Sequence, residues 1–386
     1  MSWQIKKMPE VVKWSSGCTP KRTKKEYYEN GTIPWLIISD LNNSVVTTSE
    51  TKITESGLKN SSAKMIPEGT LLVAMYGSIG KLGITGIECC TNQAIAFAKE
   101  LYSVTTKYMF YYLASIKSKL IQNGKGGTQK NISLTVLNSF SVPVPPIEEQ
   151  RRIVSRIEEL FSELDSAVET LQKTRQQLEI YRQAVLKEAF ENCKIQVRFG
   201  DIIISRLGKM LDKKKNVGVE RTYLRNANVR WFDFDLSNLL QMRITDDEID
   251  RYSLHKGDLV ICEGGEPGRC AIWKKDEMIF YQKALHRVRF KTKCKPEFYM
   301  YYMSYIAKTG TINEYFTGTG IKHLTGESLS KIPVPSTSYS QQEKITSEIE
   351  LKMSVCDSIE KTVNEALQQA EAMRQSILKK AFEGEL

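Results

Sequence analysis

Two glycine-rich stretches have the spacing closest to a nucleotide-binding motif. The segment GSIGK, residues 77–81, resembles part of a phosphate-binding loop, but the pattern G-x-x-x-x-G-K-[ST] is not completed. The segment GGEPGR, residues 264–269, is rich in glycine, yet nothing places it between a strand and the start of a helix, as a dinucleotide fingerprint requires. Both stretches are therefore interpreted as turns between strands.

Residue types that catalyse reactions or bind metals are scattered along the chain. The eight cysteines form no C-x-x-C pair, and the three histidines have no metal-type spacing. No Ser, His and Asp order suggests a catalytic triad, no acidic–acidic–lysine cluster suggests a nuclease, and the methyltransferase tetrapeptide N/D-P-P-Y/F is absent. We therefore expect no catalytic residue, metal or cofactor in this chain. The cysteines are expected to be reduced thiols.

The sequence has no feature of a membrane or secreted protein. No apolar run approaches 18 residues, and the first residues, MSWQIKKMPEVV, lack the apolar core of a signal peptide. A cytoplasmic location without membrane contact is the expectation.

Positive charge follows a repeat in the chain. The net charge is +10, and it is distributed as +8 in residues 1–146, −3 in 147–191, +8 in 192–335 and −3 in 336–386. A basic segment that occurs twice suggests two contacts with a polyanion. The alternative is a basic surface that only maintains solubility.

Two long amphipathic segments follow the basic ones. Their apolar residues recur at alternating steps of four and three, which predicts helices with a heptad seam. The first seam is Ile153, Ile157, Leu160, Leu164, Ala167, Leu171, Thr174, Leu178, Tyr181 and Val185, and the second, 192 residues later, is Ile345, Ile349, Lys352, Cys356, Ile359, Val363, Ala366, Ala370, Met373 and Ile377. About 40 residues of helix would form a rod of roughly 60 Å.

The globular segments repeat as well. Gly69, Gly77 and Gly80 correspond to Gly257, Gly265 and Gly268 at a constant offset of 188. We predict an α+β protein with two similar domains, mostly β with some helices, at 1–146 and 193–335. The long helices at 147–192 and 336–386 separate the two domains and pack as an antiparallel coiled coil with pseudo-two-fold symmetry.

The helix ends and leaders resemble one known family. Each half has a P-x-P leader and a closing LK-x-AFE, and the first helix starts with E-Q-x-x-I at Glu149, Gln150 and Ile153. Together these motifs resemble the specificity subunit of a type I restriction-modification system. The series at 17–20, 27–28, 31 and 33–35 resembles one type of its target recognition domains, and YLRNANV, residues 223–229, resembles another. The second copy departs from the pattern, because SQQEK stands where P-x-x-E-Q is usual.

The resemblance implies a non-catalytic subunit in which each recognition domain reads one half of a bipartite, asymmetric site in double-stranded DNA. It further implies that the helices set the spacer and dock two modification subunits, which bring S-adenosylmethionine and methylate adenine. Restriction subunits, which use ATP and Mg²⁺, would join that core. The assembled complex would be a methyltransferase and an endonuclease.

Candidate DNA contacts follow from side-chain chemistry, because Lys and Arg neutralise phosphates while planar or paired donors and acceptors read base edges. In the first domain they are Lys21, Arg22, Lys24, Lys25, Lys81, Asn92, Gln93, Lys125, Gln129, Lys130 and Asn131. In the second they are Lys213, Lys214, Arg225, Asn226, Asn228, Arg269, Gln282, Lys322 and His323. For the basic runs the alternative is a solvated loop, and the recurring tyrosines at 108–112 and 299–302 are expected in the core.

Two other classes of function remain open at this level. A methyltransferase or nuclease in its own right would turn over DNA with S-adenosylmethionine or Mg²⁺. A coiled-coil scaffold without DNA specificity would show no salt-dependent duplex binding. The repeat with matched +8 segments favours DNA over the scaffold, and inserting one helical turn should then change the tolerated spacer.

Overall fold

The computed structural model describes residues 3–126, 130–191, 193–212 and 214–386, and the chain divides into two compact units. Unit 1 comprises Met1–Leu171 and Glu365–Leu386, and unit 2 comprises Gln172–Asn364. Each unit contains one globular domain and a part of each of two long helices. The two units share one plan.

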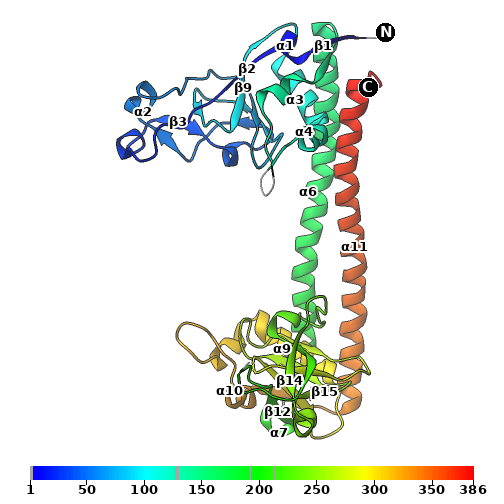
Figure 1. The fold of residues 1–386 in the computed structure, drawn as a ribbon. Helices are drawn as coiled ribbons and strands as arrows, with labels where there is room; N and C mark the ends of the chain where they lie inside the picture. Colours follow the sequence, from blue (N-terminus) through cyan, green and yellow to red (C-terminus); the bar gives the residue numbers. More distant parts are fainter. Residues whose placement is uncertain (1–2, 127–129, 192, 213) are drawn as a thin grey trace. The chain divides into compact units, whose positions relative to one another are not determined.

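The two long helices are α6 (Ile147–Glu191) and α11 (Tyr339–Glu383), drawn in green and in orange to red in Figure 1. Pro146 directly precedes α6, and two acidic residues lie in its first turn, where they favour the positive end of the helix dipole. In unit 1 the start of α6, with Ile153, shares a core with the end of α11, with Leu378. In unit 2 Val185, near the end of α6, shares a core with Ile349 of α11. The predicted antiparallel pairing is confirmed in each unit.

The predicted heptad seam is wrong at four positions. Ala167 is exposed, and so are Tyr181, Ile359 and Met373, with 48%, 40% and 54% of their surface accessible. All of them are reached by a step of three, whereas seam residues reached by a step of four, such as Leu178 and Val185, are buried. At each of these places the following residue is less accessible than the predicted one. At two of these places the inward residue is arginine, Arg182 or Arg374, and each pairs with an acidic residue of the other helix.

Unit 1 has three sheets. Its strands are β1 (Gln4–Lys7), β2 (Val12–Ser16), β3 (Ile33–Leu36), β4 (Val45–Val46), β5 (Lys52–Ile53), β6 (Leu71–Ala74), β7 (Leu82–Thr85), β8 (Cys90–Thr91), β9 (Ile95–Leu101) and β10 (Ser141–Val144). The sheet orders are β2-β9-β6-β7-β4, β5-β3-β8 and β1-β10. The β3–β8 and β4–β7 pairs are parallel, and the others are antiparallel.

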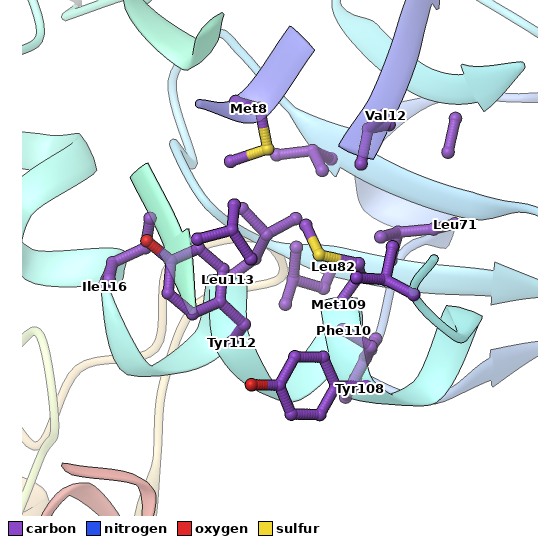
Figure 2. Close-up of a cluster of buried hydrophobic side chains, with 14 of the residues drawn as sticks. Met8, Val12, Leu71, Leu82, Tyr108, Met109, Phe110, Tyr112, Leu113 and Ile116 are labelled. Atoms are coloured by element: carbon purple, nitrogen blue, oxygen red, sulfur yellow. The ribbon is translucent and has the colours of Figure 1, made fainter. Parts of the chain in front are cut away.

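Four short helices share the core of the larger sheet of unit 1: α1 (Met8–Val11), α3 (Thr106–Ser115), α4 (Lys117–Gln122) and α5 (Leu134–Asn138). The helix α2 (Glu55–Lys59) packs with the smaller sheet instead. Thr105 caps α3, because its hydroxyl accepts from the amide of Tyr108. Figure 2 shows the α3 side chains Tyr108, Met109, Tyr112 and Leu113 clustered with residues of α1 and of the sheet. The tyrosines of this helix therefore belong to the core, as predicted.

Unit 2 repeats this order. Its strands are β11 (Gln196–Arg198), β12 (Ile203–Leu207), β13 (Val219–Leu224), β14 (Leu240–Ile244), β15 (Ser253–Leu254), β16 (Leu259–Cys262), β17 (Cys270–Ile272), β18 (Ile279–Tyr281), β19 (Leu285–Phe290) and β20 (Pro333–Pro335), and its short helices are α7 (Phe199–Ile202), α8 (Ile249–Tyr252), α9 (Pro296–Lys308) and α10 (Gly326–Lys331). The sheet orders are β12-β19-β16-β17, β14-β13-β18-β15 and β11-β20. The β13–β18 pair is parallel, as is the β3–β8 pair of unit 1.

A buried glutamine ties each long helix to its own domain. The side-chain amide of Gln150 donates to the carbonyls of Ser103 and Pro145, and its oxygen accepts from the amide of Thr105 at 2.9 Å. Gln342 repeats this in unit 2, because it accepts from the amide of Lys295 at 2.9 Å and donates to Thr337. The altered SQQEK leader therefore retains Gln342, the counterpart of the anchoring Gln150.

In the described part of the chain, no helix combines the length and the apolar character needed to cross a membrane.

Candidate nucleic-acid interface

Four segments of unit 1 that carry predicted contacts are joined by backbone hydrogen bonds. They are the loop after β2 (17–25), the turn between β8 and β9 (92–94), the turn after β6 (75–80) and the hairpin that pairs Lys125 with Asn131. The amide of Cys18 donates to Thr91 at 2.9 Å, and that of Met75 to Ala94 at 2.8 Å. The amide of Ile132 then donates to Met75 at 2.9 Å, so residues far apart in the sequence form one surface.

Unit 2 has the same four segments and the same bonds. The amide of Lys209 donates to Tyr281 at 3.1 Å, and that of Glu263 to Ala284 at 2.9 Å. The amide of Leu324 donates to Glu263 at 2.7 Å, and Thr317 and His323 close the equivalent hairpin. We call the surface formed by these four segments the loop face of each unit.

A glycine permits the first two segments to approach each other. A Cβ on Gly17 would lie 2.1 Å from the carbonyl oxygen of Thr91, and a Cβ on Gly208 would lie 2.3 Å from that of Gln282. No side chain fits at either position. Gly17, which begins the series that resembles a target recognition domain, is therefore required for the loop face.

The predicted phosphate contacts of unit 1 are mostly exposed. Lys21, Arg22 and Lys25 are exposed in the loop after β2. Lys24 is exposed too, but it pairs with Glu26 at 3.4 Å and lies over the ring of Tyr27. Lys125 and Lys130 are exposed on the hairpin. Lys81, Lys117 and Lys130 line one hollow of about 570 Å³, in which none of the lining residues is acidic.

The predicted amide readers of unit 1 differ in availability. Gln93 is exposed, and its carboxamide oxygen accepts a hydrogen bond from the Thr19 hydroxyl. Asn92 is half-buried, and its side-chain oxygen accepts from the amide of Ala94 at 3.1 Å. Asn131 is exposed. Gln129 lies outside the described residues.

In unit 2 the exposed candidates are Lys214 and Lys322. Lys214 follows Asp212, whose carboxylate accepts from the Lys214 amide at 3.0 Å and shapes this turn. Lys322 lies on the hairpin beside the half-buried His323. Lys213 lies outside the described residues.

Lys81 and Arg269, both predicted as DNA contacts, bind backbone carbonyls of their own unit. Lys81 donates to the carbonyl of Ile38 at 3.1 Å, and Arg269 donates to the carbonyl of Asn226 at 2.9 Å. Ile38 and Asn226 begin the 3₁₀ turns η2 (Ile38–Asp40) and η3 (Asn226–Asn228), which have the same place in the two units. These two cations position equivalent turns beside the loop face.

Asn228 is not available to read a base, because it is buried and its carboxamide makes hydrogen bonds within the fold. It is 2% exposed, it donates to Asp235 and Asn238, and it accepts from the amide of Arg225 at 3.0 Å. Arg225 is half-buried and donates to Asn238 at 2.8 Å.

The turn after β16 brings other predicted residues of unit 2 together. A Cβ on Gly264 would lie 3.3 Å from the imidazole of His323, and a Cβ on Gly265 would lie 2.8 Å from the carboxamide nitrogen of Asn226. Gln282 and His323 line one hollow of the loop face. This hollow is formed by Met210, Leu211, Glu263, Gln282, Lys283, Ala284, Thr317, His323 and Thr325.

Sequence reasoning missed Glu263 and Lys283 in this hollow. A signal existed, because TNQAIAF at 91–97 aligns with YQKALHR at 281–287, which pairs Gln93 with Lys283. Buried His286 lies nearby, and its Nε2 is 2.8 Å from the carbonyl oxygen of Leu324. Burial lowers the pKa of His286, against an opposing effect of the Glu263 carboxylate.

Both repeats match the same domain family. The family described as "Type I restriction modification DNA specificity domain" matches residues 1–179 and 195–369. The chain therefore belongs to this family of DNA specificity proteins. It is similar to the type I restriction enzyme EcoKI specificity subunit of Escherichia coli K12, with 24% identity over 413 residues, which covers 100% of this chain and 89% of that protein.

Two solved structures share the fold. One, described as addressing complex assembly and conformational transition of the type I R-M system, matches with a TM-score of 0.81 and 16% identity over 100% of this chain and 98% of its own. The HsdS subunit from Thermoanaerobacter tengcongensis matches with a TM-score of 0.58 and 16% identity, over 100% of this chain and 97% of its own. The predicted fold class is thereby confirmed.

Proposed function

We propose that the chain is the sequence-reading subunit of a type I restriction-modification complex, and that each loop face reads one half of a bipartite, asymmetric DNA site. The observation that carries this proposal is the duplicated loop face. The same four segments and backbone bonds occur in both units, whereas the side chains displayed on them differ. A shared frame with different side chains is what reading two different half-sites requires.

The chemistry of each loop face suits duplex DNA. Exposed lysines and arginines neutralise phosphates and give affinity, and the amide and imidazole side chains among them can read base edges. Lys21, Arg22 and Lys25 are candidates for the first role in unit 1, and Gln93 and Asn131 for the second. In unit 2 Lys214 and Lys322 have the first role, and Gln282 and His323 the second.

The long helices suit the other two functions that this proposal includes. Both α6 and α11 are continuous over 45 residues and contribute to both units, so their length would set the spacer between the half-sites. In unit 2 they expose apolar side chains, among them Ile180, Leu351 and Val355, with 67%, 69% and 54% of their surface accessible. Such an apolar surface fits the docking of a modification subunit.

The reaction itself would belong to partner subunits in the cytoplasm. Two modification subunits would bind S-adenosylmethionine and methylate adenine, and restriction subunits would use ATP and Mg²⁺. The chain supplies recognition alone. Incubation of the purified chain with DNA and S-adenosylmethionine, or with DNA and Mg²⁺, should therefore give no product.

The decisive experiment is to express the chain with its modification subunit in cells that lack other adenine methylation, and to map the methylated adenines. We expect a single bipartite motif with two unlike halves and a fixed spacer. Duplex binding by the complex should weaken steeply with salt. Salt-independent binding, or methylation without a bipartite motif, would favour a protein scaffold and overturn the proposal.

A further inference from the structure

An acidic residue lies in the hollow of the second loop face, where negative charge opposes DNA binding. Glu263 lines this hollow with Gln282, Lys283 and His323, and it is half-buried. Within the described residues, its carboxylate takes part in no hydrogen bond or ion pair, although its charge acts on the buried ring of His286. A carboxylate that approaches DNA is repelled by phosphates, so its presence calls for a compensating contact with a base.

The fold does not require an acid at this position. Glu263 and Met75 are equivalent, because each donates its amide to the alanine of the second segment and accepts from the residue after the hairpin. Met75 is 4% exposed and belongs to the core of unit 1. The same backbone position therefore accommodates a buried thioether in one unit and a half-buried carboxylate in the other.

We propose that Glu263 is a specificity-determining residue, whose carboxylate accepts a hydrogen bond from the exocyclic amine of a cytosine in the major groove of the second half-site. This inference rests on the proposed function and deepens it.

Cytosine suits a lone carboxylate better than adenine does. An ionised carboxylate only accepts hydrogen bonds, and cytosine presents its N4 amine in the major groove. In adenine the N6 amine lies beside N7, an acceptor that would repel the carboxylate. Guanine and thymine present acceptors on this edge, so their approach to Glu263 would be unfavourable. The residue would select one C·G base pair by accepting one partner and rejecting the others.

The test uses the chain co-expressed with its modification subunit and compares methylated motifs between variants. In Glu263→Gln, the amide can both donate to N7 and accept from N6 of adenine. We expect one C·G position in one half-site to accept A·T, with discrimination there falling about tenfold or more. Glu263→Met, which introduces the residue of the equivalent position in unit 1, should relax the same position without a new preference.

Glu277→Gln is the matched control. Glu277 is exposed in the loop after β17, at the end of the β16–β17 hairpin opposite the Glu263 turn, and its substitution removes the same charge. It should leave every position of the motif unchanged. The other half-site, which unit 1 reads, also reports on the integrity of each variant complex.

The outcomes separate this inference from the proposed function. If the wild-type complex gives a bipartite motif and both Glu263 variants give the identical motif, the inference is overturned and the proposed function stands. The same holds if the relaxed position is an A·T pair in the wild type. If the wild type gives no bipartite motif, the proposed function itself fails.

Discussion

Arg182 of α6 donates to the carboxylate of Asp357 of α11 at 2.7 Å, and exactly one helix repeat later, 192 residues on, Arg374 of α11 bridges to Asp165 of α6. The two pairs belong to different units and are equivalent residue for residue. In unit 2 the same guanidinium also reaches Glu360 at 2.7 Å, and the two acids raise the pKa of Arg182 despite its burial.

The first prediction concerns this pairing. Arg182→Met should destabilise unit 2, and a double-mutant cycle with Glu360→Gln should give a coupling energy of about 1 kcal/mol at low salt, since the arginine is only 14% exposed. The coupling should shrink in 1 M salt. Urea unfolding measures it, and Arg156→Met, which removes an exposed pair with Glu159, serves as the control. Equal losses of unfolding free energy in Arg182→Met and Arg156→Met would contradict a special role of Arg182.

The second prediction tests the helix anchor. Gln342→Ala should reduce the free energy of unfolding by about 3 kcal/mol, because the amide of Lys295 and the carbonyl of Thr337 lose their buried partner. Its exposed neighbour Gln341 provides a matched control. Thermal unfolding should show a clear decrease for Gln342→Ala and almost none for Gln341→Ala. Similar melting temperatures for the two variants would refute the anchor.

The third prediction concerns the close approach of two loop-face segments. Gly208→Ala should cost about 2 kcal/mol, because its methyl group would meet the backbone of Gln282. Recognition of one half-site should be impaired, while the other half-site remains. Gly320, where an added Cβ meets no atom within 4 Å, is the control. Wild-type methylation by Gly208→Ala would show that the segments can separate.

The fourth prediction is a pH dependence in unit 2. Burial holds the pKa of His286 below its usual value of 6.5, so the folded state favours the neutral ring. This contribution is complete above pH 6.5 and is lost as the pH falls toward the lower pKa of the folded state. His286→Ala, the residue of unit 1 at this position, should show a smaller fall in melting temperature between pH 7.5 and 5.5. His255→Gln, at an exposed histidine, should retain the full decrease.

The fifth prediction separates phosphate contacts from base contacts. Arg22→Ala and Lys25→Ala should weaken duplex binding similarly for all sequences, and each should reduce the salt slope by about one. Gln93→Ala should instead relax one base position and leave the salt slope unchanged. Lys7→Ala, on β1 and outside the four segments, should change neither. Binding titrations at several salt concentrations would distinguish these outcomes, and a sequence-specific effect of Arg22→Ala would contradict its assignment.

Predictions from the sequence succeeded where a repeated residue type indicates one kind of local structure. The apolar repeat predicted both long helices and their antiparallel pairing, and the glycines at a constant offset predicted equivalent turns. The predicted seam failed at Ala167, Tyr181, Ile359 and Met373, where the following residue is the less accessible one, because the apolar type of a side chain does not decide which residue of a helix faces its partner.

The candidate site was predicted less well than the fold. A lysine, arginine or asparagine can bind DNA or make hydrogen bonds within the fold, and the sequence alone does not distinguish these roles. Lys81 and Arg269 bind carbonyls of the 3₁₀ turns, and Asn228 is enclosed. Glu263 was missed because a search for positive charge and amides passes over a carboxylate.

The equivalence of Met75 and Glu263 also bears on how such a chain changes its target. The backbone bonds that hold the four segments run between main-chain atoms, so at this position they form with either a thioether or a carboxylate side chain. If Glu263 selects a base as proposed, a substitution there would alter the chosen base and leave the frame intact. The two halves could then diverge independently of each other, within the limit that the glycines at 17 and 208 are kept.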